Sequence, residues 1–327
     1  MTPLFGHDAA VAAFRTSMES GRLHHAWLIS GPGGIGKGLF ARKAALRLLA
    51  EGAGPPVALP GVDVPDEHPI ARLVEAGSHP DYMLLERQAR EGSGELVRNI
   101  TVAQVRGLQR LFANTSALSP WRTVVIDAID DLERPAANAL LKNLEEPPAN
   151  TVFFLVSHVP ARLLPTIRSR CRHMRLAPLA DDAMTSALEC LLPDAEPQEI
   201  RALVEVGEGA PGRALAFRGL DILALDRAME ELAESGDRSN ARRSALAQSL
   251  ASKAAQARYE AFLARAPSMI ARKARSRRGP ALADALRLWE RAQDLAGSAT
   301  RLSLDPQSVV FELAGMLAAL APRQADG

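Results

Sequence analysis

Cysteine is nearly absent from this sequence, and long apolar runs are missing altogether. Cys171 and Cys190 are the only two cysteines among 327 residues, too few for a disulfide framework or a four-cysteine zinc site. We expect both to be buried as small side chains. No window reaches the roughly 18 apolar residues of a membrane span, and the beginning, MTPLFGHDAAVAAF, lacks a basic segment followed by an apolar run. The sequence therefore predicts a cytoplasmic protein without membrane contact.

An excess of either charge sign is also lacking. Lys plus Arg is 39 and Asp plus Glu is 38, which gives a net charge of +1. The whole-chain charge therefore offers no reason to expect strong DNA binding by the chain alone. One local exception is the basic run RKARSRR at 272–278. Because no aromatic residues interleave it, a solvated helix face is favoured over direct DNA contact.

What the sequence does contain is an alternation of apolar runs and helical patterns. Three runs predict buried strands: HAWLIS before a glycine-rich turn, Trp121 to Ile129, and TVFFLVS at 151–157. Between the last two runs, PAANALLKNLEEPP predicts a helix that Pro147 and Pro148 terminate. This alternation is typical of βαβ units, so the fold class is α/β with a parallel sheet.

The remaining composition predicts three domains. Residues 51–69 are rich in Pro and Gly without a period and predict a loop. Strand signals end after Pro178, and short helices are expected over 181–218, around the turn in GEGAPGRAL. Helical periods rich in Ala, Leu and Arg then continue, with breaks expected near Gly236, Pro267, Gly279 and Pro306. The predicted domains are 1–178, α/β; 179–219, small helical; and 220–327, all helical.

The glycine-rich turn has the pattern of a phosphate-binding loop. GPGGIGK at 31–37 fits the first seven positions of G-x-x-x-x-G-K-[S/T] between a strand and a helix. Backbone N–H groups at Gly31, Gly33, Gly34 and Gly36 would cradle phosphate, and Lys37 would neutralise it. The eighth position is Gly38, so the hydroxyl that normally binds Mg²⁺ is missing. Two roles of this turn are left open: it binds ATP, or it only connects the strand to the helix.

A second part of a nucleotide site follows the strand in VVIDAIDDL. Asp127 stands where a carboxylate would hold Mg²⁺ through water, although a loop or capping aspartate is the alternative. The next residue is Ala128, which cannot accept a proton from an attacking water. We therefore expect no bound metal and no ATP hydrolysis. Ser157, after the third strand, would either hydrogen-bond a γ-phosphate or cap the strand end.

Three further segments carry a family resemblance. NALLKNLEEPP at 138–148, then FFLVSH, then LLPTIRSRC at 163–171 occur in this order. In order and spacing they resemble the delta prime, gamma and tau subunits of bacterial clamp loaders, which are members of the AAA+ superfamily. The match runs from about Phe5 to Arg175, and helical signals of the right kind continue to about residue 320. The resemblance implies a RecA-like P-loop domain, a helical lid and a helical collar that joins the subunits in a ring.

The resemblance also implies a function and a catalytic residue. The Ser-Arg-Cys of the family corresponds to Ser169, Arg170 and Cys171, and its arginine reaches the ATP of the neighbouring subunit. Arg170 would thus be an arginine finger in trans, with an ordinary surface or ion-paired arginine as the alternative. The implied role is in loading the sliding clamp for DNA polymerase III. The implied partners are gamma or tau, delta, the clamp, and primer-template DNA through the assembled complex.

Departures from the family decide between its members. Gly38 and Ala128 make the chain more similar to delta prime than to the gamma and tau motors. An active P-loop ATPase of gamma, tau or helicase-loader type remains the alternative function. Many relatives carry four zinc-binding cysteines after the first helix, but residues 51–78 contain none, and His68 and His79 alone do not make such a site. We therefore expect no zinc, and we do not expect Arg213 to contact nucleotide.

Overall fold

The computed structural model describes residues 2–90, 92, 96–113 and 115–322. The chain divides into two compact units, Met1–Ala214 and Leu215–Gly327. The predicted division into three domains stays a prediction.

A parallel sheet forms the centre of the first unit. Its strands are β1 (Ala26–Ser30), β2 (Tyr82–Glu86), β3 (Arg122–Asp127), β4 (Thr151–Ser157) and β5 (Arg172–Arg175). They lie in the order β2-β3-β4-β1-β5, and every neighbouring pair is parallel. The predicted α/β class is confirmed. Because all strands run the same way, the residues that end β1, β3 and β4 lie at one edge of the sheet.

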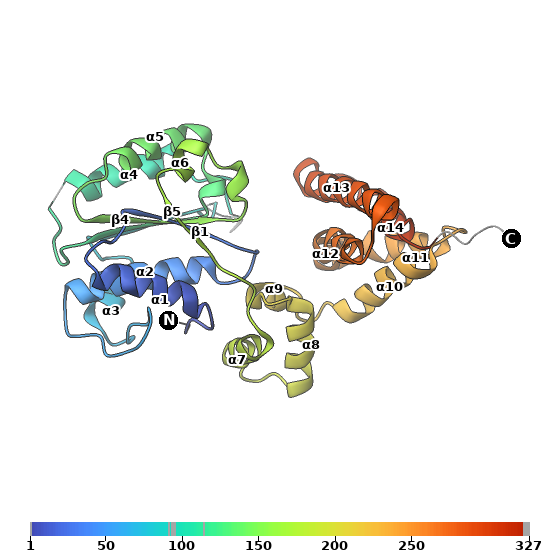
Figure 1. Cartoon of the computed structure of the whole chain (residues 1–327), viewed down its shortest axis with the longest axis horizontal. Helices are drawn as coiled ribbons and strands as arrows, with labels where there is room; N and C mark the ends of the chain where they lie inside the picture. The colour runs from blue at the N-terminus through green and yellow to red at the C-terminus, as the bar shows by residue number, and fades with distance from the viewer. Residues whose placement is uncertain (1, 91, 93–95, 114, 323–327) are drawn as a thin grey trace. The chain divides into compact units, whose positions relative to one another are not determined.

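Helices cover both faces of this sheet (Figure 1). On one side are α1 (Asp8–Glu19), α2 (Lys37–Gly52) and α3 (Pro69–Glu75), and on the other α4 (Val102–Ala113), α5 (Arg134–Glu145) and α6 (Pro165–Arg168). Two short 3₁₀ turns, η1 (Ile129–Asp131) and η2 (Pro160–Arg162), follow β3 and β4. The helix predicted from PAANALLKNLEEPP is α5, and the predicted loop at 51–69 largely lies between α2 and α3.

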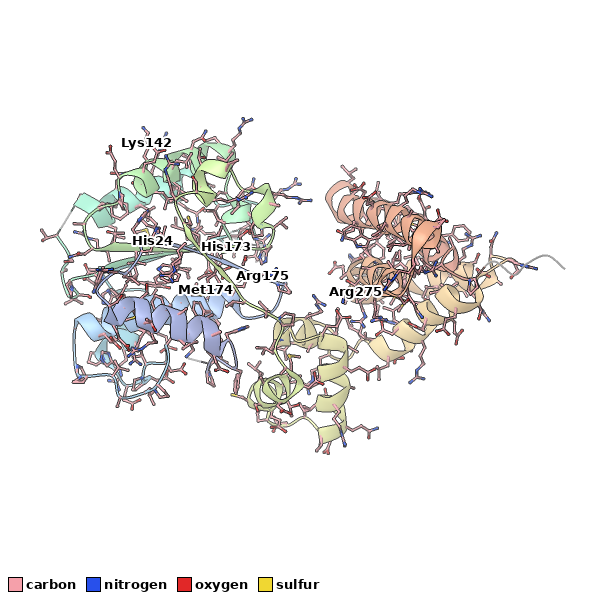
Figure 2. The ribbon with its side chains drawn as sticks, in the orientation of Figure 1. His24, Lys142, His173, Met174, Arg175 and Arg275 are labelled. Carbon is pink, nitrogen blue, oxygen red and sulfur yellow. The ribbon has the colours of Figure 1, made fainter. Side chains whose placement is uncertain are left out.

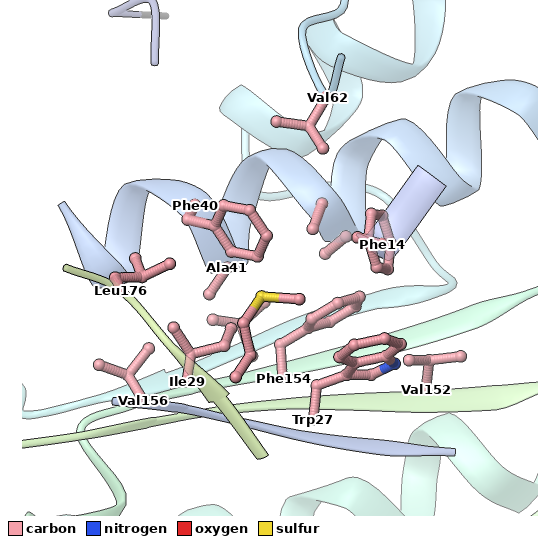
Figure 3. Close-up of a cluster of buried hydrophobic side chains, with 14 of the residues drawn as sticks. Phe14, Trp27, Ile29, Phe40, Ala41, Val62, Val152, Phe154, Val156 and Leu176 are labelled. Carbon is pink, nitrogen blue, oxygen red and sulfur yellow. The ribbon is translucent and has the colours of Figure 1, made fainter. Parts of the chain in front are cut away.

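Aromatic side chains fill the core between the sheet and α1 and α2 (Figure 3). The ring of Phe14 meets those of Trp27 and Phe154 edge to face, with centroids 5.6 Å apart in each pair. On the opposite face Phe153 and Leu155 pack with residues of α4 and α5. Strand β4 is therefore buried on both faces, as its unbroken apolar run predicts.

The last strand, β5, is held by side chains as well as by the backbone. His173 and Ser30 share a side-chain hydrogen bond of 2.6 Å, and Met174 belongs to the core between the sheet and α1 and α2. His173, Met174 and Arg175 of this strand are labelled in Figure 2. The guanidinium of Arg172 lies 4.8 Å from the ring centroid of Trp27. Three short helices, α7 (Asp181–Leu191), α8 (Pro197–Gly207) and α9 (Pro211–Ala216), follow β5 as predicted.

The described residues of the second unit contain helices and no strand. These helices are α10 (Ile222–Ser235), α11 (Ala241–Leu250), η3 (Lys253–Ala255), α12 (Gln256–Arg275), α13 (Gly279–Leu302) and α14 (Pro306–Ala318). The breaks predicted near Gly236, Gly279 and Pro306 are confirmed. Across the described part of the chain, no helix is both long and apolar enough to cross a membrane.

The break predicted at Pro267 is wrong. Pro267 is buried inside α12. A proline within a helix removes one N–H donor and crowds the preceding turn. Here the buried side chains of Phe262, Ala266 and Ile270 hold the helix on both sides of it, so tertiary packing overrides the local preference.

The prediction for the cysteines is wrong for Cys190. Cys171 is partly buried, and burial raises the pKa of its thiol to about 12. Cys190 is exposed on α7, because the buried stripe of that helix consists of Met184, Ala187 and Leu188, and Cys190 lies off it.

Candidate functional site

The predicted phosphate loop connects β1 to α2 at the carboxyl edge of the sheet. Ser30, the last residue of β1, is in register with Ser157 at the end of β4. Asp127 ends β3 and is in register with Val156. The fold therefore brings the loop, Asp127 and Ser157 together on three adjacent strands, which is where ligands bind in open α/β sheets.

Lys37 is turned inward beneath the loop. Its side-chain nitrogen donates to the carbonyl oxygens of Gly31 and Pro32, both at 2.7 Å. Burial lowers the pKa of Lys37, and the negative charges of Asp127 and Asp130 oppose that shift. The ammonium group is thus held by the backbone of the loop.

The start of α9 closes on this loop. The N–H of Gly212 donates to the carbonyl of Gly34 at 2.8 Å. Gly34 has φ = 77°, and a Cβ built on it would lie 2.5 Å from the backbone nitrogen of Arg213. Only glycine fits both the left-handed backbone and this approach. Arg213 itself pairs with Glu208 at 2.7 Å.

Asp127, the predicted magnesium carboxylate, is already paired with a cation. Its Oδ2 lies 3.3 Å from Nη1 of Arg42, and the same nitrogen lies 3.6 Å from Oε2 of Glu86. Gly38 and Ala128 supply no oxygen from a side chain. In the described residues, no group of three or more His, Cys, Asp or Glu side chains could hold a metal. Because Asp127 is paired with Arg42 and position 38 has no hydroxyl, these residues do not fit a Mg²⁺ ion, which is usually held by one or two carboxylates together with water and phosphate oxygens.

The hydroxyl of Ser157 makes a hydrogen bond to another side chain of the protein. It donates to Oδ1 of Asp130 at 3.1 Å, and the N–H groups of His158 and Val159 donate to the same carboxylate at 2.6 and 3.1 Å. Asp130 therefore ties the turn after β3 to the turn after β4 with charge-assisted hydrogen bonds. Contact between Ser157 and a γ-phosphate stays a prediction.

Arg170 belongs to a second cluster. Its Nη1 donates to the carbonyl of Thr166 at 2.9 Å, and its Nη2 lies 2.8 Å from Oε1 of Glu145. The side chain is 34% exposed. Both partners belong to α5 and α6, whereas Lys37 and Asp127 gather around the loop between β1 and α2. The sequence-predicted site residues thus form two groups.

The two histidines considered for zinc organise the backbone instead. Nδ1 of His68 accepts from the N–H of Ile70 at 3.2 Å and caps α3, while its Nε2 lies 3.0 Å from the carbonyl of Pro55. Nδ1 of His79 accepts from the N–H of Asp81 at 3.1 Å.

Sequence reasoning missed Arg42 and Glu145. Arg42 follows Gly38 by four residues, so the helical period places both on one face of α2. That spacing is a signal that could have pointed to Arg42. Glu145 lies in the NLEEPP segment, but its distance from Arg170 along the chain hides their pairing.

Comparison with known proteins identifies the family. The sequence pattern described as "DNA polymerase III, delta subunit" matches residues 6–180. The chain belongs to this family. The match to the DNA polymerase III delta subunit family includes the phosphate loop, Asp127, Ser157 and Arg170, and it ends before α7.

Individual relatives are also named as subunits of DNA polymerase III. The chain is 37% identical over 198 residues to DNA polymerase III subunit delta' of Pseudomonas aeruginosa, covering 60% of this chain and 56% of that protein. It is 32% identical over 226 residues to DNA polymerase III subunit delta' of Escherichia coli, covering 67% and 62%. It is 30% identical over 219 residues to DNA polymerase III subunit tau of Escherichia coli, covering 65% and 31%. The matched region thus spans less than two thirds of each of these relatives.

Proposed function

We propose that the chain is a delta prime subunit of a bacterial DNA polymerase III clamp loader and acts in the cytoplasm. In this role it assists the ATP-dependent loading of a sliding clamp. Its partners are gamma or tau, delta and the clamp, and it meets primer-template DNA through the assembled complex. One observation carries the proposal: the chain has an intact Ser169-Arg170-Cys171 motif together with a phosphate loop whose nearby carboxylate, Asp127, is paired with Arg42.

In the proposed complex Arg170 acts on the nucleotide of a neighbouring subunit. A guanidinium has five N–H donors, and the contacts to Thr166 and Glu145 use two of its nitrogens. The remaining donors can meet the γ-phosphate oxygens, where they offset the charge that develops during hydrolysis. Glu145 and Thr166 hold the guanidinium in place, which lowers the entropy lost when it binds phosphate.

The chain's own loop is proposed to hold nucleotide phosphate without hydrolysing it. Lys37 and the backbone N–H groups of the loop can bind phosphate. Hydrolysis would need a metal ligand at position 38 and a base at position 128, and glycine and alanine supply neither. The alternative function is an active P-loop ATPase. Turnover by the isolated chain that Lys37→Ala abolishes would favour that alternative.

The proposed function is tested by changing Arg170 in the reconstituted clamp loader. Arg170→Ala is expected to lower clamp- and DNA-stimulated ATP turnover of the whole complex by on the order of tenfold or more. Arg170→Lys should restore it only in part, because lysine keeps the charge and lacks the planar fork. Size-exclusion chromatography checks that each mutant complex is fully assembled.

A matched control comes from the same segment. Arg168 is an exposed arginine at the end of α6, and Arg168→Ala should leave turnover within about twofold of wild type. Full turnover by an assembled Arg170→Ala complex would refute the finger role and return Arg170 to an ordinary ion-paired arginine.

A further inference from the structure

Arg42 is positioned to neutralise Asp127. Its guanidinium makes ion pairs with Asp127 at 3.3 Å and Glu86 at 3.6 Å. These two acids end neighbouring strands and face each other in the register of β2 and β3. A fixed cation between two carboxylates repels a second cation, and it pairs with one oxygen of each, Oδ2 of Asp127 and Oε2 of Glu86.

The space around Gly38 is filled by this pair. A Cβ built on Gly38 would overlap Oδ2 of Asp127 and would lie 3.1 Å from Nη2 of Arg42. A serine or threonine, which P-loop ATPases have at this position, therefore could not coexist with the observed position of the Asp127 carboxylate. Glycine allows the carboxylate to approach α2.

Helix geometry explains why Arg42 reaches this point. Residues four apart lie on the same face of a helix, and side chains lean toward the helix N-terminus. From α2, Arg42 consequently extends back over Gly38, toward the end of the helix that meets the phosphate loop. The positive charge of Arg42 is then held beside Asp127 and next to residue 38, the position at which P-loop ATPases have the hydroxyl that binds Mg²⁺.

We infer that Arg42 takes the place of Mg²⁺ at this loop. It neutralises Asp127 and excludes divalent cations, so that a nucleoside di- or triphosphate binds as the metal-free anion. The binding of nucleotide rests on the proposed function of the loop, whereas the exclusion of the cation rests only on the contacts of Arg42, Asp127 and Gly38.

The exclusion is tested by titrating Mn²⁺ into the full-length protein and measuring free Mn²⁺ by electron paramagnetic resonance. Wild type is expected to bind no more Mn²⁺ than Asp127→Asn does. Arg42→Gln should gain one site, on the order of tenfold tighter than any site of wild type, because two carboxylates lose their cation. The gain should disappear in Arg42→Gln/Asp127→Asn.

Two controls separate this effect from general changes in charge or folding. Arg106→Gln removes an exposed arginine on α4 and should gain no site. Arg42→Lys keeps the positive charge and should also gain none. A wild-type Mn²⁺ site that Asp127→Asn removes, or a folded Arg42→Gln protein without a new site, would overturn the exclusion.

A second measurement needs no substitution. The affinity of wild type for a fluorescent ADP analogue is measured in EDTA and in excess Mg²⁺. We expect the two dissociation constants to agree within about twofold, because the protein offers no side-chain ligands that would bind Mg²⁺ together with the nucleotide. Tightening by on the order of tenfold in Mg²⁺ would overturn the inference. Absence of binding in both buffers would refute nucleotide binding at the loop, and the Mn²⁺ titration would still decide the role of Arg42.

Discussion

Asp81, which directly precedes β2, organises the loop that leads into β3. Its carboxylate accepts the backbone N–H groups of Ala117 and Leu118 at 2.8 Å and of Ser119 at 3.0 Å. The residue is 2% exposed. Burial raises the pKa of Asp81, but the three N–H donors together with His79 outweigh it and hold the pKa below its usual range.

We expect that replacing the Asp81 carboxylate lowers the stability of the protein by an amount that depends on pH. Asp81→Asn should lower the free energy of unfolding by about 1–3 kcal/mol at neutral pH, because an amide cannot accept all three bonds as an anion does. The pKa is lower in the folded than in the unfolded state. The stabilisation is therefore present above about pH 4 and is lost as the pH falls below that value. Urea unfolding at neutral and acidic pH measures both effects.

The control for this change is Glu75→Gln on the exposed side of α3. It should alter the free energy of unfolding by less than about 0.5 kcal/mol at either pH. The difference between wild type and Asp81→Asn should shrink on acidification. A difference that stays constant from neutral to acidic pH would contradict the role given to the carboxylate.

Some residues of the candidate site can be predicted from the sequence, and others cannot. Lys37 and Asp127 are predictable because each follows a strand in a recognisable motif, and the parallel sheet brings them to one edge. Gly38 can be recognised from the sequence as a missing hydroxyl. The position of Asp127 beside it, and the pairing with Arg42, depend on side-chain packing between α2 and β3. The four-residue spacing places Arg42 on the same face of α2 as Gly38, but no local pattern shows that this face packs against Asp127.

At the level of elements, buried strands are easier to predict than edge strands. The apolar runs of β1, β3 and β4 are visible because these strands lie inside the sheet. By contrast β5, with the sequence RHMR, has only Met174 buried. Its strand conformation comes from pairing with β1, which is distant in the chain. Pro267 is a second case: packing of the buried side chains around it, and not its local sequence, keeps it within α12.

The contact between α9 and the phosphate loop leads to a prediction about glycine. A Cβ on Gly212 would lie 3.0 Å from both Cα and O of Gly34, which are backbone atoms that cannot rotate away. Alanine favours a helix by about 1 kcal/mol over glycine. We nevertheless expect Gly212→Ala to destabilise the protein by about 1–3 kcal/mol, because the overlap forces α9 off the loop.

Gly107 in α4 provides the matched control. A Cβ added there meets no atom within 4 Å, so Gly107→Ala should stabilise the protein by about 0.5–1 kcal/mol through helix propensity alone. Chemical denaturation of the two variants beside wild type measures both signs. Stabilisation by Gly212→Ala equal to that of Gly107→Ala would show that α9 does not need its close approach to Gly34.

On the scale of the whole molecule, the second unit has its own core. The sequence predicts an apolar stripe on its last helix, which needs either a partner surface or a common core. Val309, Val310, Leu313 and Leu317 on α14, and Leu320 just after it, are each at most 3% exposed. They pack within the unit, since α14 contacts α10, α11, α12 and α13. The common core is confirmed, and any surface for other subunits lies elsewhere on these helices.

The division into two units predicts that the chain can be cut between them. Ending the chain after Ala216 keeps α9 complete and leaves Phe217 with the second unit, where the guanidinium of Arg265 lies 5.3 Å from its ring centroid. The fragment 1–216 retains the sheet and the aromatic core around Phe14. We therefore expect it to unfold cooperatively, as judged by circular dichroism, and to remain monomeric.

If the second unit is the collar of the proposed clamp loader, the two fragments should differ in assembly. Residues 217–327 should co-purify with the other subunits, while the folded fragment 1–216 should not, because it lacks the helices that join subunits into a ring. Size-exclusion chromatography of each fragment mixed with the partner subunits, beside the full chain, measures this. A folded fragment 1–216 that assembles as well as the full chain would remove the assembly role from the second unit and assign it to the α/β unit. Failure of both fragments would instead mean that assembly needs contacts from the two units at once.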